Sequence, residues 1–151
     1  MHGLLLLHVL ATLFMVGLIW FVQIVHYPLF GQVGRDAFPA YEAEHMRRTT
    51  WVVAVPMLVE LLTGILLLWQ RPPAVAPWTA WAGVALLAVI WASTIWLQVP
   101  CHEALRQGFS ESAHAELART NWVRTIAWSL RGLLVLSMAS GASHGPGQVV
   151  H

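Results

Sequence analysis

Four long apolar stretches, separated by short polar segments, dominate the sequence. The first, residues 3–25, contains no charged residue and is long enough, as a helix, to cross a hydrocarbon core about 30 Å thick. It lacks the basic start and the small-residue cleavage site of a secretory signal peptide, so we expect a permanent spanning helix. Further crossings are predicted at residues 49–69, at residues 78–99, and in a helix that begins at Glu111 and continues through Trp122 to about Ser140.

Prolines and a serine predict where these helices end and begin. Pro28 disfavours helical geometry at the residue before it, so the first helix is expected to end at residues 26–28. Pro100 is expected to break or kink the third helix in the same way. Ser110 is the predicted N-cap of the fourth helix, and residues 70–73 are expected to form a short turn between the second and third helices.

The two halves of the chain resemble each other. Residues 48–52 (RTTWV) match residues 119–123 (RTNWV) at an offset of 71, and Glu60 matches Arg131 at the same offset. The motif that joins Gln23 to His26 resembles, with one residue inserted, the one that joins Gln98 to His102. The sequence therefore predicts an all-α, integral membrane bundle of four transmembrane helices, packed as two similar hairpins in a pseudo-two-fold arrangement.

Composition supports this class. The chain is 58% hydrophobic and 10% charged, whereas soluble domains carry about 25% charged residues. We expect one membrane domain, residues 1–140, and a disordered tail, residues 141–151. The net charge of +1 gives no indication of nucleic-acid binding, and membrane lipids are the expected surroundings. The single Cys101 excludes an intramolecular disulfide and a cysteine-based zinc site.

Arginine is concentrated in the first and third of the three connections between helices. Only Arg71 lies in the second connection. Because positive residues stay on the cytoplasmic side, we expect both long connections inside the cell and both termini outside, in a bacterial inner membrane. The arginines in or beside the long connections are Arg35, Arg47, Arg48, Arg106, Arg119 and Arg124.

Glu60 and Arg131 are expected to lie near the middle of the membrane. A charge at that depth costs at least about 2.5–3.5 kcal/mol, so opposite charges at matched depth predict an ion pair across the bundle. The pair has two interpretations. One is a structural link that sets the helix register, and the other is a proton or substrate site.

Imidazole and carboxylate side chains are predicted to converge at the cytoplasmic helix ends. Glu42 and His45 lie three residues apart on one helical face, a spacing also found in carboxylate-bridged di-metal bundles. Three imidazoles with one or two carboxylates can hold iron, zinc or manganese, and two opposed imidazoles can hold a haem. For any single histidine, a hydrogen bond to a loop carbonyl is the simpler interpretation. The predicted metal ligands are His26, Glu42, His45 and His102.

Other polar residues on the same face are expected to complete a binding pocket. The predicted cofactor-binding residues are Gln23, Gln98 and Asn121. Glu103 is a second carboxylate available beside His102, and Arg124 is expected to orient an anionic group of a substrate. Glu103 and Arg124 are therefore the predicted catalytic residues.

Residues 26–60 follow the pattern HYPLFxxVGxxAFxxYExxHxRRTTWVVxxPMLVE. With the later NWVRTIAW, this pattern resembles, over residues 1–140, a set of small four-helix bacterial membrane proteins of unknown activity. The pattern NWxRTxxWxxR is also similar to anthrone-oxygenase-like membrane proteins, through Asn121, Trp122, Arg124 and Arg131. Some members of that group are linked to oxygenation of polycyclic aromatic compounds, so the resemblance implies an oxidoreductase, but it assigns no catalytic residue.

Three hypotheses of function follow. The first is a metal- or haem-dependent oxidoreductase or oxygenase that acts on a lipophilic substrate at the cytoplasmic face. The second is a non-catalytic membrane subunit that binds a partner in a larger complex. The third is a small proton-coupled carrier that works as a homodimer, with Glu60 as the proton site. The sequence contains no glycine-rich phosphate loop and no Ser/His/Asp arrangement that would indicate a kinase or a hydrolase.

Overall fold

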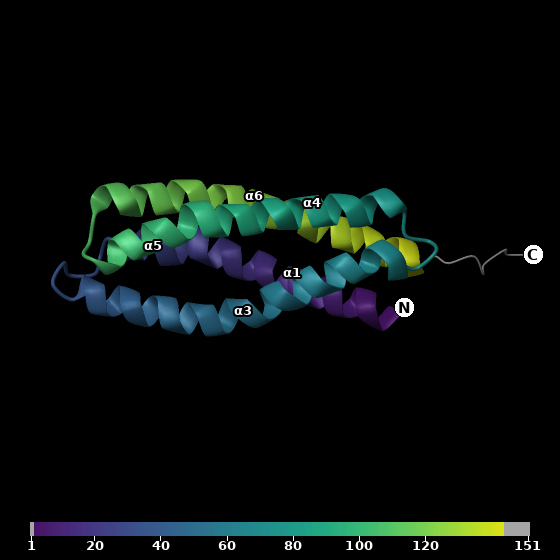
Figure 1. Cartoon of the computed structure of the whole chain (residues 1–151), viewed down its shortest axis with the longest axis horizontal. Helices are drawn as coiled ribbons and strands as arrows, with labels where there is room; N and C mark the ends of the chain where they lie inside the picture. Colours follow the sequence, from purple (N-terminus) through teal and green to yellow (C-terminus); the bar gives the residue numbers. More distant parts are fainter. Residues whose placement is uncertain (1, 144–151) are drawn as a thin grey trace, which may run out of the picture.

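The computed structural model describes residues 2–143, and every regular element in that range is helical (Figure 1). Four long rods run along the molecule. Two of them are composite, because a five-residue π-helix interrupts each one. The elements in chain order are α1 (His2–Phe21), η1 (Val22–His26), α2 (Tyr27–Phe30), α3 (Phe38–Gln70), α4 (Pro77–Ser93), η2 (Thr94–Gln98), α5 (Val99–Arg106) and α6 (Glu111–Ser143).

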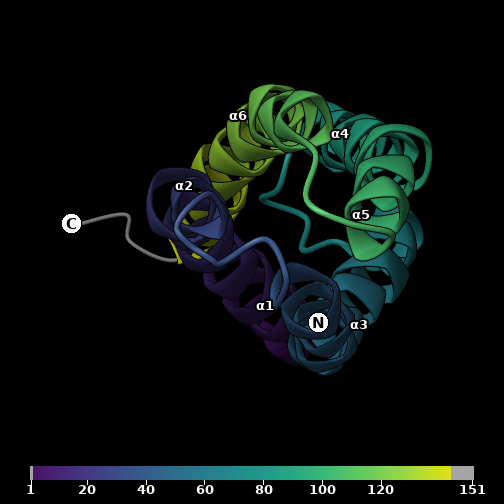
Figure 2. The same cartoon turned by 90° about the vertical axis from the view of Figure 1, so that its left-hand side faces the viewer.

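The four rods pack around a common axis, as the end-on view in Figure 2 shows. Helix α1 packs against α3 and α6, and α4 packs against the same two helices. The start of α1, the end of α6 and the turn between α3 and α4 lie at one end of the bundle (Figure 1). Residues 31–37 and 107–110 lie at the other end, which we call the loop end.

All four rods are long and apolar enough to cross a membrane. Their outward faces are apolar too: Trp51, Trp69 and Trp96 are 75%, 73% and 72% exposed. Soluble monomers rarely present such continuous apolar surface to water, whereas lipid accommodates it. The structure therefore confirms the predicted all-α bundle of four helices, built as an integral membrane protein is.

Pro28 does not end its helix, which corrects the sequence-based expectation, and Pro100 does not break the third helix. Helix continues past Pro28 and past Pro100, and in each rod a π-helix ends two residues before the proline. In the first rod the π-turn is closed by a hydrogen bond from the Tyr27 N–H to the Val22 carbonyl. An α-helix would place the proline ring against the carbonyl four residues earlier, and the wider π-turn relieves that clash.

The π-helices also correct the alignment of the two hairpins. Pro28 and Pro100 are 72 residues apart, and the two π-helices begin 72 residues apart. In this register His26 corresponds to Gln98. The sequence comparison paired His26 with His102 instead, which is four residues, or about one helical turn, further along. Both histidines nevertheless lie toward the loop end.

The start and the end of α6 agree closely with the sequence-based expectation. Ser110 caps α6, because its Oγ accepts a hydrogen bond from the Ala113 N–H at 3.4 Å. Helix α6 extends to Ser143, three residues past its expected end at Ser140. The rest of the predicted tail, residues 144–151, lies outside the described residues.

Glu60 and Arg131 meet inside the bundle, where both are almost fully buried. Arg131 Nε lies 2.8 Å from Glu60 Oε1, and a second guanidinium nitrogen donates to the Gly83 carbonyl. Thr12 donates to Glu60 Oε1 at 2.8 Å, and the Trp128 indole donates to Glu60 Oε2 at 3.0 Å. These residues belong to α1, α3, α4 and α6, so one buried network links all four rods.

His8 completes this network from α1. Its Nε2 lies 3.2 Å from Arg131 Nη2, and its Nδ1 lies 2.7 Å from the Thr63 hydroxyl. Both Glu60 oxygens and all three Arg131 nitrogens thus have partners. Such complete pairing is the geometry of a structural link that sets helix register.

Removing one partner of this pair is expected to destabilise the bundle strongly. Glu60→Ala leaves the Arg131 guanidinium buried and unpaired, which costs about 3–5 kcal/mol. Thermal unfolding in mild detergent should show a large fall in melting temperature. Glu44→Ala is the control, because Glu44 pairs with Arg47 and Arg48 at the surface and its loss should change the melting temperature little. Equal melting temperatures for the two variants would contradict the structural role.

Candidate metal centre

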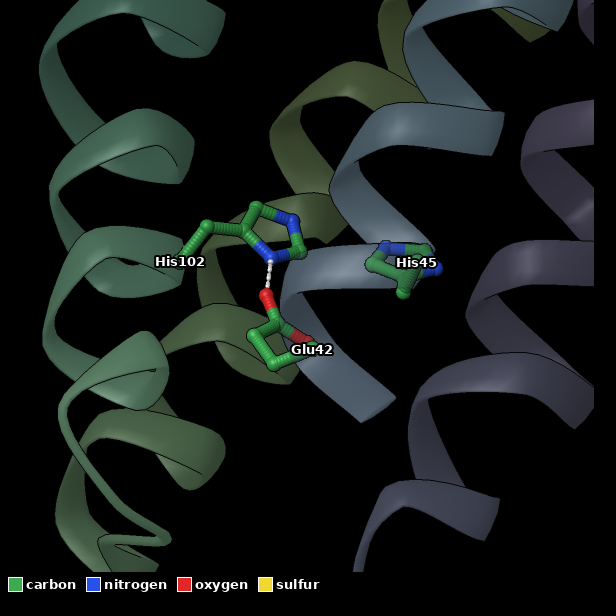
Figure 3. Close-up of side chains that lie close together, drawn as sticks. All are labelled: Glu42, His45 and His102. Atoms are coloured by element: carbon green, nitrogen blue, oxygen red, sulfur yellow. Dashed lines mark hydrogen bonds and ion pairs between the residues drawn. The ribbon is translucent and has the colours of Figure 1, made fainter. Parts of the chain in front are cut away.

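Glu42, His45 and His102 come together near the loop end of the bundle (Figure 3). Glu42 and His45 lie about one turn apart on α3, and His102 projects toward them from α5. One ligand atom from each residue lies within 4.8 Å of the other two. His102 Nδ1 and Glu42 Oε1 are 2.6 Å apart, the length of a strong charge-assisted hydrogen bond. The three side chains can therefore converge on one metal ion.

Neighbouring side chains orient both imidazole rings. His45 Nδ1 lies 2.9 Å from His26 Nε2 and 3.1 Å from the Thr49 hydroxyl. His102 Nε2 lies 3.0 Å from the hydroxyl of Tyr27, which is itself buried. Partners of this kind hold the ring of a metal-binding histidine in place and select its tautomer.

Glu42 is completely buried, and half of its carboxylate has no partner. Oε1 faces His102, but Oε2 makes no hydrogen bond among the described residues. A buried carboxylate oxygen without a donor is costly, so native sites usually place a proton, a water or a metal ion there. The donor set of one carboxylate and two imidazoles fits a transition-metal ion.

A cavity of about 140 Å³ is lined by His45 and His102, though not by Glu42. Its inner wall is formed by core side chains of α1 and α3, including Met15, Ile19 and Met57. Polar groups gather in the rest of its wall. They are Tyr27, His45, Thr49, Thr50, Thr94, Gln98, His102 and Arg124. The cavity thus offers an apolar chamber with polar groups placed on part of its lining, as small-molecule sites commonly do.

Arg124, a predicted catalytic residue, lies in the cavity wall and is 9% exposed. Its guanidinium interacts electrostatically with the Tyr27 hydroxyl and lies 5.3 Å from the centre of the Trp128 ring. Tyr27 therefore interacts with both Arg124 and His102. A continuous line of contacts runs from Glu42 through His102 and Tyr27 to Arg124.

Two of the three predicted cofactor-binding residues do not reach the cavity. Asn121 Nδ2 donates to Gln23 Oε1 at 2.9 Å, and Gln23 Nε2 donates to the Ala118 carbonyl at 3.1 Å. These bonds tie η1 to α6. Gln98 does line the cavity, and its amide donates to the Thr120 hydroxyl at 2.9 Å.

Glu103 and His26 are placed differently from expectation. Glu103 lies on the surface, where it pairs with Arg106 at 2.9 Å and accepts from Gln107, so Glu42 is the only one of the two candidate carboxylates that faces His102. Consecutive residues on a helix project about 100° apart, which is why His102 and Glu103 cannot face the same site. His26 contacts His45 and supports its ring, but lies outside the group of three.

The histidine arrangement fits a single ion better than a haem. The rings of His26 and His45 are in direct contact, with centroids 4.7 Å apart, and those of His45 and His102 are 5.3 Å apart. A bis-imidazole haem needs a porphyrin between its two ligands, and these contacts leave no room for one.

Two contributors escaped the sequence analysis as site residues. Tyr27 is absent from the predicted site residues, yet its hydroxyl lies 3.0 Å from His102 Nε2 and interacts with the Arg124 guanidinium. His114 holds the Tyr27 backbone, because its Nε2 lies 2.7 Å from the Tyr27 carbonyl oxygen. The proline directly after Tyr27 was the available signal, but it predicted a helix end rather than a π-turn.

The chain matches no family model, no curated protein sequence and no solved structure. The resemblances drawn from its sequence patterns therefore stay predictions.

Proposed function

We propose that this protein is a membrane-embedded oxidoreductase in which Glu42, His45 and His102 bind one transition-metal ion. The observation that carries the proposal is the convergence of these three ligands beside an apolar cavity. Two histidines and one carboxylate form the ligand set of many non-haem iron oxygenases, and a similar set holds zinc in some hydrolases. Iron is thus the first candidate, followed by zinc and manganese. The substrate is a lipophilic small molecule that enters the cavity.

The metal would supply redox or Lewis-acid chemistry beside the cavity. The protein's own part is to exclude water and to manage protons. Protons compete with a metal ion for imidazole and carboxylate ligands. A proton at His102 Nδ1 would have to leave, or move to Nε2 beside the Tyr27 hydroxyl, before Nδ1 could serve as a ligand. Metal affinity should therefore rise as the pH rises. Tyr27 can hold a proton at its hydroxyl oxygen, between His102 and Arg124.

Metal analysis of the purified protein tests the proposal directly. Detergent-purified wild type, loaded with iron(II) or zinc and dialysed, is expected to retain about one equivalent of metal, because its three ligands are held in place before the ion arrives. His102→Ala and Glu42→Leu should each retain less than about a tenth of that amount by inductively coupled plasma mass spectrometry.

His114→Gln is the matched control. It removes a histidine at the same end of the bundle, and its amide can keep the hydrogen bond to the Tyr27 carbonyl. It should bind metal like the wild type. Wild-type protein that retains less than a tenth of an equivalent would reject the metal site and favour a non-catalytic membrane subunit.

We also propose that the loop end faces the cytoplasm of a bacterium, with both termini on the outer side of the inner membrane. The support is the distribution of arginine: Arg35, Arg47 and Arg106 lie in or beside the connections at the loop end, and Arg71 lies in the turn between α3 and α4 at the other end. The metal site, which lies near the loop end, would then take its substrate at the cytoplasmic face.

Cysteine labelling tests this orientation. In a Cys101→Ser background, Ala74→Cys in the α3–α4 turn should react in intact cells with a membrane-impermeant maleimide. Gly34→Cys at the loop end, where an added Cβ meets no other atom within 4 Å, should react only after the cells are opened. The reverse pattern would invert the proposed topology.

A further inference from the structure

Among the described residues, four carboxylate or guanidinium side chains are buried: Glu42, Glu60, Arg124 and Arg131. Three of them have an ionisable partner. Glu60 pairs with Arg131, and Glu42 is bonded to His102. Arg124 forms no ion pair with any described residue. A buried guanidinium without a counter-ion is unusual inside a membrane bundle, because the charge has lost its hydration without gaining a partner.

The contacts that Arg124 does make are neutral. Its guanidinium interacts electrostatically with the Tyr27 hydroxyl and lies over the Trp128 ring. Its Nε, although buried, has no hydrogen-bond partner among the described residues. Glu42 does not line this cavity, and its carboxylate is engaged with His102. The positive charge of Arg124 thus has no counter-ion among the described residues, and its Nε–H has no acceptor.

Arg131 provides an internal comparison, seven residues further along the same helix. Its three guanidinium nitrogens contact Glu60, His8 and the Gly83 carbonyl, and it does not line the 140 Å³ cavity. Arg124 does line that cavity. The arginine with a complete set of protein partners is therefore enclosed by the helices, and the arginine with an incomplete set faces the chamber where a ligand can enter.

The cavity limits the size of such a ligand. Engineered apolar cavities of about 150 Å³ bind one benzene molecule, and this chamber, of about 140 Å³, has a wall of methionine, isoleucine and valine side chains. A volume of this size accommodates one six-membered ring. The planar guanidinium fork pairs well with a carboxylate or phenolate.

From these observations we infer that the cavity binds a small lipophilic anion: one aromatic ring, or a hydrocarbon group of similar size, that carries a carboxylate or phenolate and has Arg124 as its counter-ion. The inference names the substrate class of the proposed oxidoreductase and rests on that proposal in placing the substrate in this cavity. The charged group of the ligand would lie beside Tyr27, and its ring would lie among Met15, Ile19 and Met57.

Benzoate, benzamide and acetate are the probes. Isothermal titration calorimetry is done on detergent-purified, chelator-treated protein, so that no metal can bind the carboxylate. Benzoate should bind the wild type at least about tenfold more tightly than the neutral benzamide, since only benzoate completes a charge pair. It should also bind at least about tenfold more tightly than acetate, which has no ring to bury.

Variants locate the site. Arg124→Gln should weaken benzoate binding at least about tenfold and leave benzamide binding unchanged, because only the charge pair is lost. Arg119→Gln is the control from the same helix, because Arg119 pairs with Glu116 on the surface, and it should bind benzoate like the wild type.

Equal affinities of the wild type for benzoate and benzamide, or undiminished benzoate binding by folded Arg124→Gln, would overturn the inference. The comparison of ligands uses the wild type alone, so it decides the matter even if the variant does not fold. The two proposals fail separately. Arg124-dependent benzoate binding by a protein that retains no metal removes only the metal site, and metal retention without preference for benzoate removes only the anion site.

Discussion

Polar groups buried inside this bundle have no water to bind, so each needs a hydrogen-bond partner from the protein. This requirement determines how the interior is arranged. Around Glu60 and Arg131 that need is met in full, through contacts from all four rods. Replacing such a network by apolar side chains is often neutral for stability, so its value lies in fixing which helices are neighbours and in what register. That register then determines which side chains meet at the loop end.

Near the loop end the same requirement is met only in part. The proposed metal and anion sites follow from the polar atoms that lack partners there. Glu42 Oε2 and Arg124 Nε are buried without hydrogen-bond partners among the described residues. Arg124 lines the cavity, and Glu42 is bonded to His102, which also lines it. The π-helices help to place this site. One extra residue in a helical turn rotates everything after it by about 100°, so η1 and η2 set the directions of Tyr27 and His102. A π-turn inside a helix is often found at functional sites, and here each of the two precedes a residue of the site.

The architecture could be predicted from the sequence because membrane helices leave strong, local signals. Long uncharged runs give the crossings, and the opposite charges of Glu60 and Arg131 at matched depth indicate their contact. Glu42, His45 and His102 could be named for their chemistry alone. The residues that contact them could not be predicted. The direction in which side chains project after a proline depends on whether the preceding turn is α or π. That uncertainty made Pro28 and Pro100 look like helix ends, and made Glu103 as eligible as Glu42. The cavity depends on how side chains of separate helices pack, which no sequence pattern records.

X-ray absorption spectroscopy of the zinc-loaded protein tests the central claim most directly, because it reports the atoms bound to the metal. The account predicts nitrogen and oxygen ligands at about 2.0–2.2 Å, with the outer-shell scattering of two imidazoles, and loss of one imidazole in His45→Ala. A sulfur ligand at about 2.3 Å, which only Cys101 or a methionine could supply, would contradict it, and so would a shell without imidazole scattering.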